Sequence, residues 1–73
     1  AMIEGMVAGL AEKLKQNPND LESWHRLIRS YIVLQKKDEA AKAYAAAQAA
    51  FKGDDGKLAN IRTFAKELGL NGS

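Results

Sequence analysis

Hydrophobic residues recur along the chain at the three- and four-residue spacing of α-helices, in four stretches separated by turn residues. No stretch alternates apolar and polar residues over more than a few positions, as a half-buried strand does. In the first stretch, over residues 3–16, one apolar stripe contains Ile3, Met6, Val7, Leu10 and Leu14. The pattern predicts an all-α fold of about four helices.

The second and third stretches predict a pair of antiparallel helices. Asp38 restarts a helix after a connection so short that the chain must reverse direction there. Asn17-Pro18 ends the first helix, and Asn19 with Glu22 resembles an N-capping pair for the second, which runs from about residue 20 to 36. The core stripes are Trp24, Leu27, Ile28, Tyr31 and Leu34 in the second helix, and Ala40, Tyr44, Ala47 and Phe51 in the third, over residues 39–51.

The fourth stretch, over residues 55–69, predicts a last helix. Gly53 suits a left-handed end of the third helix, and Asp54 or Asp55 is expected to cap the fourth. Gly69 should end that helix and let Leu70 fold back over its last turn. The apolar stripe of this helix is Leu58, Ile61, Phe64 or Ala65, and Leu68.

Size and composition limit what holds such a fold together. The chain has 73 residues, no cysteine and one histidine. A domain this small buries about 60% of its unfolded surface, so its core is barely sufficient. Disulfides are impossible, and His25 without cysteine cannot form a zinc site of four N or S ligands, so we expect no metal and no cofactor. No run reaches the roughly 18 apolar residues that membrane insertion of this segment would need.

The residues argue against catalysis and against nucleic-acid binding. The sequence has no cysteine nucleophile, no glycine-rich phosphate loop and no pair of carboxylates on an apolar helix face, so we expect no enzyme activity. The 11 basic and 9 acidic residues are interspersed along all four helices, which is typical of a solvated surface. Glu22 with Arg26, and Asp38 with Lys42, have the spacing of helical ion pairs.

The spacing of the aromatic and small residues resembles the tetratricopeptide repeat. Trp24-x2-Leu27-x3-Tyr31 is followed by Ala40-x3-Tyr44 and Ala47, and Pro18 lies six residues before the tryptophan. The chain departs from the signature at Ile28, where a small residue is usual, and at Lys52-Gly53, where the closing proline would fall. The resemblance implies one repeat-like domain over residues 1–73. Residues 3–16 would be the second half of a preceding repeat, 20–52 one full repeat, and 55–69 the first half of a following one.

Longer strings resemble the C-terminal repeat domain of the CycH-type cytochrome c maturation family. They are Met6-Val7-Ala8-Gly9-Leu10-Ala11-Glu12-Lys13-Leu14, Asn17-Pro18-Asn19-Asp20-Leu21-Glu22-Ser23-Trp24 and Leu27-Ile28-Arg29-Ser30-Tyr31-Ile32-Val33-Leu34. The resemblance implies a periplasmic domain of a bacterial inner-membrane protein. That domain holds apocytochrome c, chiefly by its C-terminal helix, and delivers it to the haem ligation machinery. Without the resemblance, a cytoplasmic scaffold repeat would be expected.

An outer arc of the second helix is the candidate binding surface. Ile32 and Val33 form an apolar pair that the antiparallel partner helix does not need, and the basic residues around the pair suit an amphipathic helix or a C-terminal tail. Two alternatives stay open: Ile32 or Val33 packs against a neighbouring helix, or the surface serves complex assembly or self-association. The six candidate peptide-binding residues are Glu22, His25, Arg29, Ile32, Val33 and Lys36.

Overall fold

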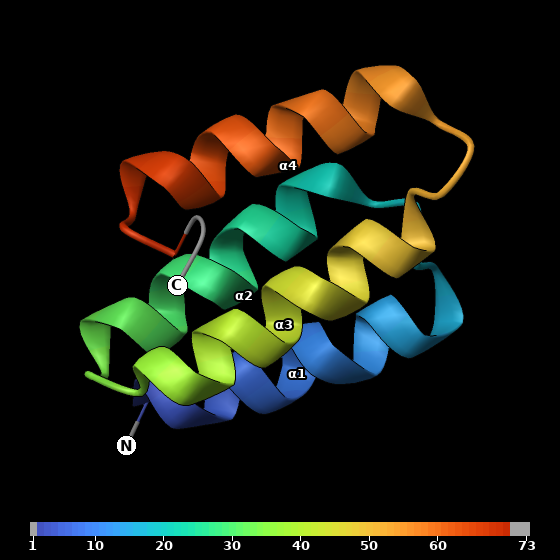
Figure 1. Ribbon diagram of the computed structural model, residues 1–73. Coiled ribbons are helices and arrows are strands. Elements are labelled where there is room, and N and C mark those ends of the chain that lie inside the picture. The colour runs from blue at the N-terminus through green and yellow to red at the C-terminus, as the bar shows by residue number, and fades with distance from the viewer. Residues whose placement is uncertain (1, 71–73) are drawn as a thin grey trace.

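Four antiparallel helices make up the described part of the chain. The computed structural model describes the backbone of residues 2–70 and the side chains of residues 5–70. Its elements are α1 (Met2–Gln16), α2 (Leu21–Val33), α3 (Lys37–Ala50) and α4 (Asp55–Glu67), and residues 2–70 contain no strand. Each helix reverses the direction of the one before it, so α2 and α4 run parallel (Figure 1). The predicted all-α fold is confirmed.

The α2 helix lies at the centre of the arrangement. It contacts α1, α3 and α4, and α3 also contacts α4. Figure 1 shows α1 and α4 at opposite edges of the molecule. The Cα atoms fill a flat slab of 35 × 28 × 15 Å, as expected where helix pairs stack side by side. This packing is that of a tetratricopeptide-like fragment.

The core combines large side chains from α2 with small ones from α3. Trp24, Leu27 and Ile28 are buried on α2, while the buried positions within α3 are all alanine. Alanines let the two helix backbones approach closely, so the larger α2 side chains can be fully covered. The complete buried apolar cluster is Val7, Leu10, Leu14, Trp24, Leu27, Ile28, Ala40, Ala43, Ala47, Phe51, Ile61, Ala65 and Leu70.

The core stripe of α1 is narrower than the sequence predicts. Val7, Leu10 and Leu14 are buried as expected, but Met6 is 49% exposed. The reason is that, among the described helices, α1 packs closely against α2 alone, so only a thin strip of its surface is covered. Ile3, the remaining member of the predicted stripe, lies outside the described side chains.

Asp20 caps α2, and the predicted pairing of Asn19 with Glu22 is wrong. A carboxylate oxygen of Asp20 accepts a hydrogen bond from the Ser23 backbone N–H at 3.2 Å, and the other accepts one from the Ser23 hydroxyl at 2.7 Å. The Trp24 indole N–H donates to the Pro18 carbonyl at 2.8 Å, which holds Asn19 within the turn before the helix. Proline and tryptophan are therefore joined by a direct hydrogen bond.

The predicted end of the second helix near residue 36 is wrong: α2 ends at Val33, and Gln35 adopts a left-handed φ of +60°, so Lys36 lies beyond the helix. The ends around α4 follow the sequence. Gly53 has φ +92° after α3, and Asp54 caps α4 by accepting from the Lys57 N–H at 3.1 Å. Gly69 has φ +81°, and the Leu70 N–H donates to the Ala65 carbonyl at 2.9 Å, so Leu70 folds back as predicted. By contrast, α3 starts at Lys37 with no side-chain cap.

One of the two predicted ion pairs forms. Arg26 Nη2 lies 2.9 Å from Glu22 Oε1, as expected for residues one helical turn apart. The predicted pair of Asp38 with Lys42 is replaced, because Lys42 Nζ lies 3.6 Å from Glu39 Oε1, three residues away. Both side chains of each pair are largely exposed, so each pair contributes little to stability.

Gly9 offers a test of the helix assignment. It lies inside α1, is exposed, and has no neighbouring atom within 4 Å of an added Cβ. We expect Gly9→Ala to raise the free energy of unfolding by about 0.5–1 kcal/mol, because alanine loses less backbone entropy on folding. Gly53→Ala should lower it by about 1–2 kcal/mol, because its positive φ is strained for any residue with a Cβ. Urea unfolding followed by circular dichroism measures both; stabilisation by both substitutions would contradict the structure.

The cap of α2 predicts a pH dependence. The hydrogen bond from the Ser23 hydroxyl, then the one from its backbone N–H, lowers the pKa of the Asp20 carboxyl below its ordinary 3.8, and the nearby Lys13 charge adds to this. A carboxyl whose pKa is lower in the folded state stabilises that state above the unfolded pKa, and the stabilisation is lost as pH falls through the folded pKa.

We therefore expect the stability advantage of the native chain over Asp20→Asn to be full at neutral pH and to shrink below about pH 4. Urea unfolding between pH 7 and pH 2 measures this difference. Ser23→Ala is the matched variant, since it removes the largest cause of the lowered pKa. A difference between Asp20→Asn and the native chain that stays constant over this range would refute the assignment.

Candidate peptide-binding surface

The first three predicted site residues lie on one side of α2. Glu22, His25 and Arg29 follow each other at one-turn intervals, and Arg26 joins them through its ion pair with Glu22. His25 and Arg29 line a small cavity of about 150 Å³ together with Arg26 and with Phe64 from α4. The structure thus places this part of the predicted surface at the junction of α2 and α4.

His25 packs against α4 through two contacts. Its ring stacks on the Phe64 ring, with the centroids 4.1 Å apart and the planes 7° from parallel. Its Nε2 lies 2.9 Å from the Oδ1 atom of Asn60, within hydrogen-bonding distance. His25 is half-buried as a result, so its Nε2 atom and one ring face are already engaged within the chain.

Arg29 is the cation most available to a partner on this side of α2. It is exposed and forms no ion pair or hydrogen bond with any described residue. Arg26, by contrast, is held by Glu22. A free guanidinium presents donors in a planar fork that suits a carboxylate.

Ile32 and Val33 differ in exposure. Ile32 is half-buried and packs against the hydrophobic core, so part of its apolar surface is already covered within the chain. Val33, at the last position of α2, is 60% exposed. Val33 therefore offers apolar surface one helical turn beyond Arg29.

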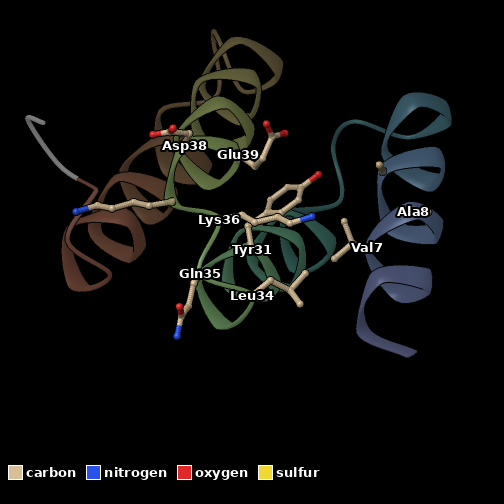
Figure 2. A pocket seen from close by; sticks show the side chains of 10 residues that line it. Val7, Ala8, Tyr31, Leu34, Gln35, Lys36, Asp38 and Glu39 are labelled. Carbon is tan, nitrogen blue, oxygen red and sulfur yellow. The ribbon is translucent and has the colours of Figure 1, made fainter. Parts of the chain in front are cut away.

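Lys36 lies apart from this group, beside a second groove. The groove runs between α1 and α3 over the side chains of Tyr31 and Leu34, and its larger section measures about 740 Å³. Figure 2 shows Val7 on α1 facing this end of α2, with the Lys36 side chain extending toward α1. A continuation of about 460 Å³ shares Ala11, Tyr31 and Glu39 with the larger section and reaches Trp24 and Ala46. Lys36 and Arg29 therefore line different cavities, and the structure does not bring them together.

Sequence reasoning missed the contribution of α4 to the surface. Asn60 was assigned no role, and Phe64 was an alternative to Ala65 for one core position. Ala65 is fully buried and takes that position, which leaves Phe64 at the edge of the core, against His25. Adjacent helix positions face directions about 100° apart, so Phe64 and Ala65 cannot both occupy the same core position. The sequence therefore already indicated that one of them faces a neighbouring surface.

The described residues show neither a metal cluster nor a membrane-spanning element. No three histidine, aspartate or glutamate side chains among them are placed to hold a metal ion. Within residues 2–70, no helix combines the length and apolar character needed to cross a bilayer.

The four antiparallel helices and their packing are consistent with a helical-repeat fragment of the tetratricopeptide-like class. Comparison with known proteins adds two relatives, each named cytochrome c-type biogenesis protein CycH. The chain is 43% identical over 72 residues to the protein from Bradyrhizobium diazoefficiens, a match that covers 99% of the chain. It is 45% identical over 73 residues to the protein from Rhizobium meliloti, with 97% covered. The chain is therefore homologous to a segment of the CycH proteins.

The match covers only part of those relatives. The chain spans 20% of the Bradyrhizobium protein and 19% of the Rhizobium protein. No family model matches the chain, and no solved structure matches it. Sequence identity of 43–45% in alignments that cover nearly the whole chain supports the family resemblance in the strings around Leu10, Trp24 and Tyr31.

Proposed function

We propose that this chain is a non-catalytic binding module of cytochrome c maturation and that its client is apocytochrome c. The proposal rests on the homology with the CycH proteins and on the strings that resemble the repeat domain of that family. In this role the module binds the C-terminal helix of the client and passes it to the haem ligation machinery. It binds no nucleic acid, metal or cofactor, and it works on the periplasmic side of the inner membrane.

The observation that carries the proposal is the exposed end of α2. Val33 is 60% exposed beside the half-buried Ile32, and Arg29 lies one turn earlier without a partner among the described residues. An uncovered apolar side chain next to a free cation matches an amphipathic helix with an acidic residue at the edge of its apolar face. Ile32 and Val33 would supply contact area, and Arg29 would set the orientation.

The proposed module consists of one full repeat with a helix on each side. Residues 20–52 form the repeat, residues 3–16 correspond to the second helix of a preceding repeat, and residues 55–69 to the first helix of a following one. The contacts of α2 with α1 and α4 support this division, because stacked repeats bury each helix pair against its neighbours.

The groove between α1 and α3 is the competing location for the client. It is larger than the cavity beside Arg29, and alanines from both helices line it. The exposed arc of α2 is preferred because it carries Val33, whose apolar side chain the described residues leave 60% exposed. Two basic and two acidic residues line the groove, a mixture that favours neither charge: Lys36, Lys37, Asp38 and Glu39.

Substitutions on the two surfaces separate these locations. We expect Val33→Asp to weaken binding of an apocytochrome c C-terminal helix peptide by about tenfold or more, because a buried carboxylate would lose its hydration. Arg29→Ala should weaken binding about two- to fivefold, the usual contribution of an exposed ion pair. Fluorescence polarisation with a labelled peptide measures both affinities.

Matched controls on the other surface are Ala46→Asp and Lys42→Ala. Both residues are exposed and line the groove between α1 and α3, so neither change should alter the affinity. The opposite pattern, with loss of binding only in the control variants, would move the site to that groove. Sedimentation velocity on the same samples tests self-association: a concentration-dependent dimer that Val33→Asp abolishes would instead make the surface an assembly interface.

A further inference from the structure

The stacked rings of His25 and Phe64 separate two cavities on the α2–α4 surface. Both residues line the cavity of about 150 Å³ beside Arg26 and Arg29. The same two residues line a second, open cavity of about 500 Å³ on the α4 side. The ring pair is thus shared by two hollows, one bounded by α2 and the other bounded chiefly by α4.

Each hollow carries one charge without a partner among the described residues. Arg29 lines the first, where Arg26 is already paired with Glu22. Glu67, near the end of α4, lines the second and forms no ion pair or hydrogen bond with any described residue. The other charged residues in the second half of α4, Arg62 and Lys66, line neither cavity. The two sides of the ring pair therefore differ in the sign of their free charge.

The α4 side of the surface is hollowed because several of its side chains are small. Gly56, Ala59 and Thr63 recur at three- and four-residue intervals, all three are exposed, and all three line the larger hollow. A helix laid along this side can approach the α4 backbone closely. Because Asn60 and Phe64 engage His25, α4 is held beside α2, and the spacing between the two charges depends on these contacts.

We propose that α2 and α4 together select a client helix by charge on its two edges. The inference rests on the proposed function and adds α4 to the site. The occupant is an amphipathic helix whose apolar face covers the ring pair and Val33, with acidic side chains on the edge facing Arg29 and basic side chains on the edge facing Glu67. His25 and Asn60 are positioning residues in this arrangement, because they fix α4 relative to α2.

Three synthetic helices with one common apolar face test the edge selection. Each is about 18 residues long, enough for a helix to form. One has an acidic and a basic edge, one has two acidic edges, and one has two basic edges. Isothermal titration calorimetry at low salt measures the three affinities. The native chain should prefer the mixed helix by about fivefold over either of the others.

Charge reversal then predicts a change of preference in each variant. Arg29→Glu should favour the helix with two basic edges, and Glu67→Arg the helix with two acidic edges. The double variant should again favour the mixed helix, which then binds in the opposite direction. Recovery in the double variant excludes misfolding as the cause of the single-variant results. The differences in affinity among the three helices should disappear at 0.5 M salt, because exposed charges are then screened within about 5 Å.

The outcomes distinguish this inference from the proposed function. Equal affinity of the native chain for all three helices, with the apocytochrome c peptide still bound through Val33, would overturn edge selection and leave the proposed function in place. Retention of the mixed preference in both single variants would also overturn it. Absence of binding by the native chain to every helix, the apocytochrome c peptide included, would overturn both.

Discussion

Packing of large side chains on α2 against the alanines of α3 is the interaction on which the rest of the structure depends. Trp24, Leu27 and Ile28 become buried because the facing helix is small enough to come close. Covering one such side chain contributes about 1.5–3 kcal/mol, a large share of the stability of a 73-residue chain. Since α2 also contacts α1 and α4, both outer helices are positioned relative to this pair.

The central position of α2 links the core to the candidate surface. Three helices cover most of its circumference, and the arc that remains carries Arg29 and Val33. Part of that arc is covered by α4, whose Phe64 and Asn60 contact His25. The available surface is therefore smaller on α2 than the six predicted residues suggest, and it extends onto a helix that the prediction left out.

Local signals in the sequence were reliable where one helix turn or one backbone conformation decides the outcome. The positive φ of Gly53 and the cap at Asp54 fall where the sequence placed them. Local signals failed where hydrogen bonding in a turn or the cover given by neighbouring helices decides the outcome. Trp24 hydrogen-bonds to Pro18 across the turn, and Asp20 caps α2. Met6 is exposed because, among the described helices, α1 packs closely against α2 alone.

The sequence by itself determined the number of helices, most of their core stripes and the repeat-like spacing around Trp24, because periodicity and turn residues act over a few positions. Only the tertiary structure decided which outward-facing side chains stay available. Ile32 and Val33 are neighbours in the sequence, yet one packs against the core and the other is exposed. His25 reaches Phe64, 39 positions away, because the chain reverses twice and returns α4 to the side of α2, a relation that helical periodicity alone does not encode.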